Sequence, residues 1–430
     1  MKKYENYKDS GLEWLGMVPE HWEVMPIKYV LEQSNEGIKI GPFGSALTGK
    51  VSTEHPVRVY GQWNVVGKDF NAGKNFVTEE TYHELSSYQI SANDILISMM
   101  GTVGKCAIIP ETADKGIMDS HIVKIRLDQN KVLPEYFYYI YDKDCSKVII
   151  EQIQCNKRGS IMDGLNSSLI KNFVITLPPL SEQRTIASYL DQKVGQIDAL
   201  ISEKEKMVED LKAYRSSLIT ETVTKGLDKE VEMKDSGVEW IGKMPQDWKL
   251  LKLKRIVNLK SGTTLTSDRI LDEGKYQVFG GNGPRGYIDD YTNEGNFVLI
   301  GRQGALCGNI NYANGKFWAT EHAIICYPLK DIDTIWLGET LRAMNLNQYS
   351  ISAAQPGLAV ERINELLIPT PSISEQKEIS SYLKLRIIQI ESAISEQEHQ
   401  LSDLKSYKSS LITEAVTGKI DLRDWQTKKS

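Results

Sequence analysis

The sequence lacks several features that would point to a membrane, a metal site or an oxidising compartment. No apolar run approaches the roughly 18–20 residues that a membrane-spanning helix needs. The five cysteines are scattered without a close pair of the kind that binds zinc, and an odd number of dispersed thiols is typical of a reducing cytoplasm. None of the six histidines lies four residues from another. We therefore expect a cytoplasmic protein with no membrane partner, no bound metal and no other cofactor.

A strong excess of positive charge is also missing. The net charge is −6, and it is spread so that residues 23–180 carry 16 basic and 18 acidic side chains while residues 249–371 carry 13 and 12. Neutralisation of phosphates supplies much of the affinity of DNA-binding proteins. These two regions are therefore not expected to bind DNA tightly without help from another protein.

Motifs of nucleotide-dependent catalysis and of methyl transfer are incomplete or absent. Residues 44–50 satisfy most of a phosphate-binding loop, but Val51 stands where a Ser or Thr would hold Mg²⁺. The sequence has no Asn-Pro-Pro-aromatic or Asp-Pro-Pro-Tyr segment of the kind that amino-methyltransferases use. We expect no catalytic residues in this chain.

What the sequence does contain is an internal repeat. Residues 181–225 recur as residues 374–418 with a constant shift of 193 positions, and residues 8–22 recur as residues 234–248 with a shift of 226. Weaker echoes lie in between, such as the Gly-x-x-Gly of positions 101–104 and 301–304. A repeat of this kind determines the architecture before any site is considered. It predicts a molecule built twice.

The two copies of the longest repeated segment are predicted to be long helices. Their apolar residues recur at alternating spacings of three and four, which is typical of a coiled-coil seam, and Ser181 and Ser374 are predicted N-caps. Pairing the two helices with each other would bury both apolar stripes. We predict an antiparallel coiled coil whose interface contains Leu190, Ile197, Ile201, Val208, Leu211, Leu383, Ile390, Ile394, Leu401 and Leu404.

The divergent regions between the repeated segments are predicted to be compact α+β domains. Short apolar runs at residues 94–98 and 296–300 lead into glycine turns, which is typical of strands, and residues 133–141 resemble a short amphipathic helix. The predicted order is an N-terminal repeated segment, a first domain, a helical spacer with its linker, a second domain and a C-terminal helical spacer. Their limits are residues 1–22, 23–180, 181–248, 249–371 and 372–430.

Four motifs, in this order and mostly duplicated, resemble the specificity subunits of type I restriction–modification systems. They are residues 14–22, residues 41–45, residues 178–183, and the helix end Ser-Ser-Leu-Ile-Thr-Glu. The resemblance covers nearly the whole chain. It implies two target-recognition domains of similar fold, separated by two conserved helices and related by a pseudo-twofold axis. It further implies that each domain reads one half of a bipartite DNA sequence.

The resemblance also implies a set of partners. These are double-stranded DNA, two adenine-methyltransferase subunits and two restriction (motor–nuclease) subunits that can join them, while the specificity subunit has no catalysis of its own. One stretch departs from the pattern, because residues 155–164 lack the Ala-Gln-Pro-Gly form found at residues 354–357. The role of that loop in the first domain is correspondingly less defined.

The chemistry of base edges indicates which residues could read DNA, since Arg and Lys suit guanine while Asn and Gln suit adenine. The segment at residues 280–286 is the strongest candidate for a DNA contact, because a glycine-dense loop brings backbone and an arginine close to a ligand. The candidates are Gln62, Asn64, Lys68, Lys157 and Arg158 in the first domain, and Gln277, Asn282, Arg285, Arg302 and Gln303 in the second.

Alternatives remain open from the sequence. The duplicated helices alone would also fit a coiled-coil interaction scaffold without DNA specificity, whereas a fused enzyme is disfavoured by the incomplete motifs. His121 and His322 occupy equivalent positions and favour a repeated structural hydrogen bond over a base contact. The duplicated tryptophans Trp14, Trp22, Trp240 and Trp248 favour packing at the start of each domain over anchoring a partner.

Overall fold

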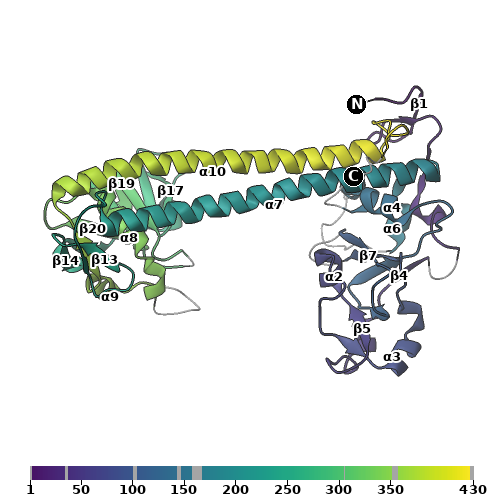
Figure 1. The fold of residues 1–430 in the computed structure, drawn as a ribbon, viewed down its shortest axis with the longest axis horizontal. Coiled ribbons are helices and arrows are strands. Elements are labelled where there is room, and N and C mark those ends of the chain that lie inside the picture. Colours follow the sequence, from purple (N-terminus) through teal and green to yellow (C-terminus); the bar gives the residue numbers. More distant parts are fainter. Residues whose placement is uncertain are drawn as a thin grey trace. The chain divides into compact units, whose positions relative to one another are not determined.

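The computed structural model describes residues 2–33, 37–99, 104–142, 147–156, 167–304, 306–350 and 357–426. The chain divides into two compact units (Figure 1). Unit 1 comprises residues 1–204 and 400–430, and unit 2 comprises residues 205–399. Two long helices, α7 (Leu180–Lys225) and α10 (Ile373–Val416), contribute about half of their length to each unit. The units are defined by packing, whereas the limits predicted above describe repeated and divergent stretches of sequence.

Unit 1 contains a hairpin, a strand pair and two small sheets. The hairpin pairs β1 (Tyr7–Asp9) with β2 (Met17–Pro19), and β3 (Glu23–Pro26) pairs with β11 (Val174–Leu177). One sheet has the order β4 (Ile38–Ile40), β10 (Ile122–Ile125), β7 (Ile95–Ser98) and β8 (Cys106–Ile108). The other has the order β6 (Phe76–Val77), β5 (Val57–Tyr60) and β9 (Gly116–Met118). The shorter helices are α1 (Gly44–Leu47), α2 (Gln62–Gly67), α3 (Glu79–Glu84), α4 (Pro134–Tyr141), α5 (Val148–Asn156) and α6 (Ser167–Asn172).

Unit 2 repeats this plan with a single larger sheet. Its hairpin pairs β12 (Met233–Asp235) with β13 (Lys243–Pro245), and β14 (Lys249–Lys252) pairs with β21 (Leu367–Thr370). The sheet has the order β15 (Val257–Ser261), β20 (Ala323–Pro328), β18 (Asn293–Gly301), β19 (Ile310–Ala319), β16 (Tyr276–Gly280) and β17 (Gly283–Ile288). Its shorter helices are α8 (Thr334–Ala343) and α9 (Val360–Asn364).

The two domains have the same order of strand pairings and differ in one connection between strands. In unit 2 the long strand β19 pairs with β18 along its first part and, in parallel, with β16 at its end. In unit 1 two separate strands make these pairings: β8 pairs with β7, and β9 pairs in parallel with β5. Pro110 lies in the stretch that separates β8 from β9, and a proline cannot donate a ladder hydrogen bond. Unit 1 accordingly has two sheets where unit 2 has one.

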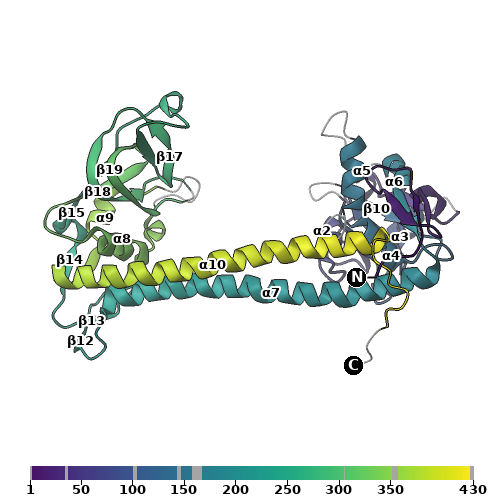
Figure 2. The ribbon, with the colours of Figure 1, turned by 90° about the horizontal axis from the view of Figure 1, so that it is seen from above.

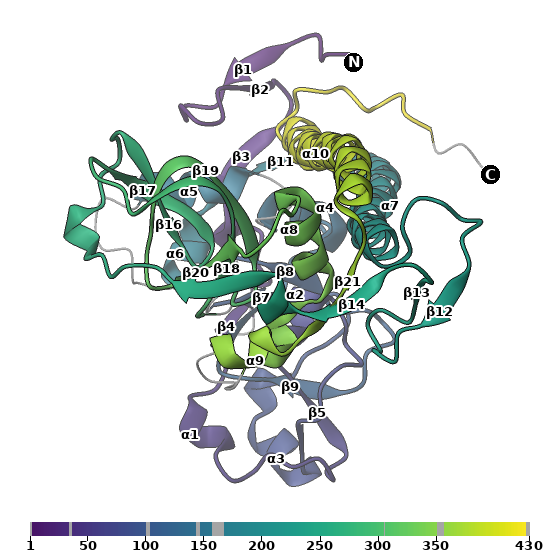
Figure 3. The same cartoon turned by 90° about the vertical axis from the view of Figure 1, so that its left-hand side faces the viewer.

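Apolar strands and an amphipathic helix make the core of each unit. In unit 2, α8 lies between the large sheet and the helix pair (Figure 3), and its fully buried Trp336 belongs to one core with Val298 of β18 and Leu383 of α10. In unit 1, all four residues of β7 and of β10 are buried, and α4, which begins at Pro134 as predicted, packs against the neighbouring strand β8. Burial of this apolar surface is the main stabilising contribution in both units.

The predicted antiparallel coiled coil is confirmed within each unit. In unit 1 the ammonium groups of Lys204 and Lys408 lie 2.5 Å from Gln400 and 2.6 Å from Asp198, and in unit 2 Lys212 and Arg215 lie 2.9 Å from Glu398 and 3.2 Å from Glu391. Residue numbers therefore rise on one helix as they fall on the other. The predicted interface residues are buried or half-buried in unit 1 at Leu190, Ile197, Ile201, Leu401 and Leu404, and in unit 2 at Val208, Leu211, Leu383, Ile390 and Ile394.

The predicted N-cap at Ser374 is wrong by two residues. Helix α10 begins at Ile373, and Ser372 makes the capping contacts, because its hydroxyl accepts a hydrogen bond from the Glu375 amide at 3.3 Å. The Glu375 carboxylate in turn accepts from the Ser372 amide at 3.4 Å, which completes a reciprocal capping box. Pro179 takes the position of Ser372 in the first repeat, so Ser181 likewise lies inside α7 rather than capping it.

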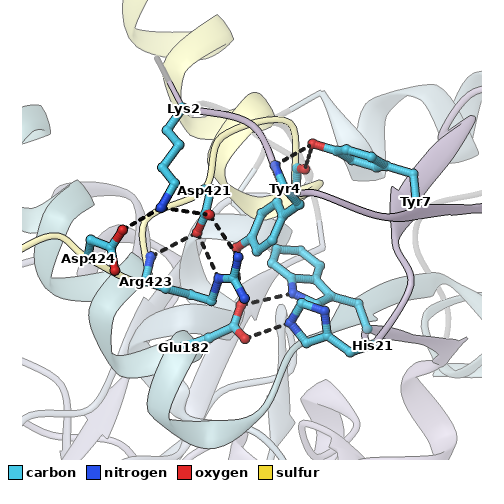
Figure 4. Close-up of polar contacts among 10 residues, drawn as sticks. Lys2, Tyr4, Tyr7, His21, Glu182, Asp421, Arg423 and Asp424 are labelled. Carbon is cyan, nitrogen blue, oxygen red and sulfur yellow. Dashed lines mark hydrogen bonds and ion pairs between the residues drawn. The ribbon is translucent and has the colours of Figure 1, made fainter.

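The two ends of the described chain meet in unit 1 (Figure 4). The Asp421 amide donates to the carbonyl oxygen of Lys2 at 2.9 Å, and the Tyr7 hydroxyl donates to the carbonyl oxygen of Gly418 at 3.2 Å. Two nitrogens of Arg423 donate to the Asp421 carboxylate at 3.0 and 2.9 Å. In unit 2 the equivalent connection is covalent, since the hairpin β12–β13 simply follows α7 (Figure 2). Non-covalent contacts of backbone and side chains in unit 1 thus lie where the chain is continuous in unit 2.

Among the described residues, no helix is both long and apolar enough to cross a membrane, and no cluster of His, Cys, Asp and Glu could hold a metal ion.

We predict that Asp421→Asn weakens the closure of unit 1. The side chain of Asp421 is nearly inaccessible, and its hydrogen bonds from Arg423 lower its pKa. Losing the charge is expected to lower the unfolding free energy by about 1–2 kcal/mol. Because the folded-state pKa is lowered, the wild-type advantage is complete above the ordinary pKa of 3.8 and disappears as the pH falls through the lowered value.

Thermal unfolding of both proteins across this pH range measures the effect. The control is Asp424→Asn, because Lys2 is the ion-pair partner of this exposed carboxylate among the described residues and an exposed ion pair contributes less than about 1 kcal/mol. Equal stability of Asp421→Asn and wild type at neutral pH would contradict the prediction.

Candidate DNA interface

In unit 2, three loops, two of which contain glycine, approach one another closely at one edge of the large sheet. A Cβ atom at Gly301 would overlap the carbonyl oxygen of Gly281, and one at Gly281 would lie 3.1 Å from the carbonyl oxygen of His322. Gly283, which starts β17, has a φ of +95°, a region that favours glycine. The turn between β16 and β17 can therefore lie against the loops after β18 and before β20 only because side chains are absent there.

Four of the predicted DNA-reading residues gather at this edge. The Asn282 side-chain oxygen accepts a hydrogen bond from Asn309 at 2.7 Å, and the Gln303 side-chain oxygen lies 3.0 Å from Nδ1 of His322. Arg302 donates to the Ser261 hydroxyl at 3.2 Å. Arg285 is exposed, and none of the described residues forms an ion pair with it. The edge offers amide groups held in place and one arginine available to a ligand.

The fifth candidate of the second domain lies a few residues away. Gln277 is exposed on β16, where it pairs with Tyr287 of β17 and Phe317 of β19. Because side chains alternate along a strand, Gln277 points away from the core that buries Val278. It shares a strand with the glycine-rich turn but makes no described contact with it.

Unit 1 has an equivalent edge, built by the same close approach. A Cβ at Gly41 would overlap the carbonyl oxygen of Asp119, just as one at Gly262 in unit 2 would overlap that of Ala319. Burial raises the pKa of the Asp119 carboxyl, which accepts a hydrogen bond from the His121 amide at 2.8 Å. Phe43, within the Gly-Pro-Phe-Gly-Ser motif, is 87% exposed beside this edge. Phe43 is not among the DNA-reading residues predicted above, although its motif is one of the four that carry the family resemblance.

The candidates of the first domain are not brought together as those of the second are. Gln62 is half-buried at the start of α2. Lys68 ends the same helix in the left-handed conformation, and its ammonium lies 4.7 Å from the centre of the Tyr138 ring of α4. It lines a cavity of about 430 Å³ that also includes Asp191 of α7. Lys157 and Arg158 lie outside the described residues.

Asn64 requires a correction, because the structure gives it a purely structural position. It is fully buried, and its oxygen accepts from the Gly61 amide at 2.9 Å. Its amide nitrogen donates to the carbonyl oxygens of Asp69 and Ala72 at 2.7 and 2.9 Å. Every polar atom of the side chain is occupied within α2 and the turn after it. An asparagine suited to adenine by chemistry is thus inaccessible to a base.

In each repeat, a tryptophan of the opening motif contacts the glutamate at the start of the long helix, which joins two motifs that are far apart in the sequence. The Trp22 indole nitrogen donates to Glu182 at 3.1 Å, and the equivalent Trp248 nitrogen donates to Glu375 at 3.0 Å. Trp22 and Trp248 are buried, which confirms packing at the start of each domain as their role. The recurrence of both motifs in each half of the chain was the signal that could have predicted this contact.

Comparison with known proteins agrees with these features. The profile of the type I restriction–modification DNA specificity domain matches residues 19–210 and 245–399. The chain belongs to this type I specificity family. It is 31% identical to the specificity subunit of the Escherichia coli restriction enzyme EcoprrI over 300 residues, which cover 68% of this chain and 70% of that protein. It is 25% identical to the MjaVIII specificity subunit of Methanocaldococcus jannaschii, over 98% and 97% of the two chains.

Solved structures show the same fold. A chain from a structure that addresses complex assembly and conformational transition of the type I system has a TM-score of 0.71 and 18% identity, with 94% and 99% of the two chains covered. The crystal structure of the HsdS subunit from Thermoanaerobacter tengcongensis has a TM-score of 0.51 and 17% identity, with 94% and 98% covered. Membership of the type I specificity family supports the DNA-specificity hypothesis over the scaffold hypothesis.

We predict that Asn64→Ala lowers stability without changing which bases are preferred. The substitution leaves the Gly61 amide and two carbonyl groups without their partner, which is expected to cost about 1–3 kcal/mol of unfolding free energy. Chemical denaturation measures this loss. Asn71→Ala is the matched control, since Asn71 is exposed seven positions later and its replacement should change stability by less than about 0.5 kcal/mol. A changed base preference with unchanged stability would show that Asn64 reads DNA after all.

Proposed function

We propose that this chain supplies the sequence specificity of a type I restriction–modification complex, with each domain reading one half of a bipartite DNA site. The observation that carries the proposal is the duplicated edge, at which glycines allow close approach of backbone in both domains. Family membership supports DNA as the ligand. Two similar but not identical edges suit two different half-sites.

The chemistry of the second edge favours readout in the major groove. An exposed arginine such as Arg285 can donate two hydrogen bonds to the O6 and N7 atoms of a guanine, and amides such as Asn282 and Gln303 can pair with an adenine. The hydrogen bonds to Asn309 and His322 hold these amides in place before DNA arrives. Less side-chain entropy is then lost on binding. The glycines at the same edge allow backbone amides to approach phosphates.

We further propose that the chain is not catalytic and that two methyltransferase subunits, and restriction subunits where they are present, act on the DNA that it selects. The nearly balanced charge of both domains supports this division of labour, because tight DNA binding requires cations that neutralise phosphates. The methyltransferases would supply that surface. A cytoplasmic location follows from the proposed access to chromosomal DNA.

We predict that Arg285→Ala relaxes specificity at one base pair of one half-site. Loss of a bidentate arginine–guanine contact should reduce discrimination there by about 1–3 kcal/mol and leave the other half-site unchanged. Methylome sequencing of cells that carry the variant and its methyltransferase would show the relaxed position directly.

The matched control is Lys330→Ala. It removes one exposed positive charge beyond Pro328, the last residue of β20, whereas the glycine-rich edge lies at the start of that strand near Ala323. An unchanged methylation motif in the Arg285 variant would exclude this residue from base readout.

We also predict that the helix pair sets the spacer between the half-sites. Deleting residues 201–207 together with residues 394–400 removes one heptad from each helix, or about 10 Å at 1.5 Å per residue. Since base pairs are about 3.4 Å apart, the preferred spacer should change by about three base pairs. Methylome sequencing would show the new spacer. An altered half-site with the old spacer would contradict the role of the helices as a spacing element.

A further inference from the structure

One aromatic ring of unit 1 is far more exposed than any other large apolar side chain among the described residues. Phe43 is 87% exposed, whereas the next in rank, Leu385, is 59% exposed. Phe43 follows the buried Pro42 and lies beside the edge of unit 1 at which Gly41 meets the backbone of Asp119. The ring contributes almost no burial to the fold of its own domain, so it is available to a ligand at this edge.

The backbone around Phe43 holds the ring in a defined place. The Gly41 amide donates to the carbonyl oxygen of Ile122, the first residue of β10, at 2.9 Å. The ring of Pro42 fixes one backbone angle of the next residue along. The carbonyl oxygen of Phe43 accepts from the Ala46 amide at 2.8 Å. The aromatic side chain is therefore presented from a braced segment, and little backbone entropy is lost when it meets a ligand.

Unit 2 contains the same bracing, with a different residue at the exposed position. The Gly262 amide donates to the carbonyl oxygen of Ala323, the first residue of β20, also at 2.9 Å. Two residues after Gly262 lies Thr264, which is exposed. Thr264 is thus the structural equivalent of Phe43.

The segment that carries Thr264 belongs to the candidate DNA edge of unit 2. Ser261, directly before Gly262, accepts a hydrogen bond from Arg302 at 3.2 Å. Arg302 in turn donates its backbone amide to the carbonyl oxygen of His322 at 2.8 Å. Position 264 is therefore close in the chain to residues of the glycine-rich edge, and its equivalent in unit 1 holds a phenylalanine.

The chemistry of the major groove limits what such a ring can recognise. Base pairs offer hydrogen-bond donors and acceptors there, and the C5-methyl group of thymine is the one apolar group among them. Phe43 has no hydrogen-bonding group in its side chain, so the methyl group is the base feature that it suits. Thr264 also carries a methyl group, which can make the same kind of contact. Beside Phe43, the Ser120 hydroxyl and Nδ1 of His121 lie 3.3 Å apart and remain for polar contacts.

We propose that Phe43 reads a T·A base pair of one half-site through contact with the C5-methyl group of the thymine. The inference rests on the proposed function for DNA as the ligand, and it deepens that function by naming one base and the residue that selects it. The first domain then uses an apolar contact at its edge, whereas the second uses an arginine and amides. This difference explains why polar residue types alone do not identify the reading residues of the first domain.

Single replacement of thymine by uracil tests the contact, because it removes one methyl group and keeps the hydrogen bonds of the base pair. The substrates are synthetic duplexes of the bipartite site, once methylome sequencing has defined it, with each thymine replaced in turn. Binding by the full chain in complex with its methyltransferase subunits is measured by competition with the unmodified duplex. At one thymine of one half-site, uracil should weaken binding by about fourfold, which corresponds to one buried methyl group.

The Phe43→Ala variant should lose this discrimination. It should bind the thymine duplex more weakly than wild type does, and bind the thymine and uracil duplexes equally. Phe43→Leu should retain part of the preference, since leucine keeps an apolar side chain at the position. Thermal unfolding of both variants should be unchanged, because the ring is exposed.

The matched control is Tyr29→Ala. Tyr29 is another exposed aromatic residue of unit 1, at 56%, but it lies in the short helix before β4, where its carbonyl oxygen accepts from Lys131 at 3.2 Å. Its replacement should leave the preference for thymine over uracil as it is in wild type. Loss of that preference in the Tyr29 variant would contradict a contact specific to Phe43.

The other outcomes are distinct from one another. Absence of a uracil effect at every thymine in wild type, or the same effect in Phe43→Ala, would overturn the inference and leave the proposed function intact. A wild-type-specific rise in the fluorescence of 2-aminopurine placed in the half-site, without any uracil effect, would identify the ring as a wedge between bases and overturn the methyl contact. A complex that methylates DNA without preference for any sequence would refute the proposed function and this inference with it.

Discussion

The structure depends on two side chains in the first turn of each long helix, which tie that helix to its domain. Gln183 is fully buried; its oxygen accepts from the Leu133 amide at 2.9 Å, and its nitrogen donates to Lys131 and Pro178. Gln376 repeats this arrangement with the Asp333 amide, at 3.0 Å, and Pro371. The neighbouring Glu182 and Glu375 receive the indoles described above. An amide and a carboxylate so placed fix the direction in which the helix leaves the domain, because buried polar groups are costly to leave without partners.

This constraint explains why the repeated motifs are far apart in sequence and always occur together. The Glu-Gln pair starts the helix, the tryptophan belongs to the segment after the hairpin, and the backbone groups that Gln183 and Gln376 contact lie directly before α4 and α8. A divergent domain can be inserted between these parts, provided that the three contacts are kept. The second domain is accordingly shorter, yet both helices keep their length. Recognition can change in such a chain without disturbing the frame.

The elements with a strong local pattern could be predicted from the sequence, and those that depend on tertiary contacts could not. The long helices followed from the spacing of their apolar residues, and α4 followed from its proline start. The presence of two sheets in unit 1 and the cap at Ser372 depend on neighbours that no periodicity reveals. The same limit applies to the site. Arg285 and Asn282 lie in a glycine-rich turn that can be recognised in the sequence. Asn64 has the same side chain as Asn282, but its amide nitrogen is hydrogen-bonded to the turn after α2. Residue type selects what could contact a base, and only burial decides whether it is accessible.

Duplication gives the two halves the same frame but leaves their ends unequal. In unit 1 the tail after α10 is held by the buried side chains of Ile420 and Leu422 and by the ion pair of Asp421 with Arg423. In unit 2 the equivalent stretch is tethered at both ends by peptide bonds, and nothing requires it to bury itself. Leu227 of this linker is 41% exposed, whereas Ile420 at the equivalent position of the tail is buried, so the segments that follow the two long helices pack differently although the helices themselves are near-copies.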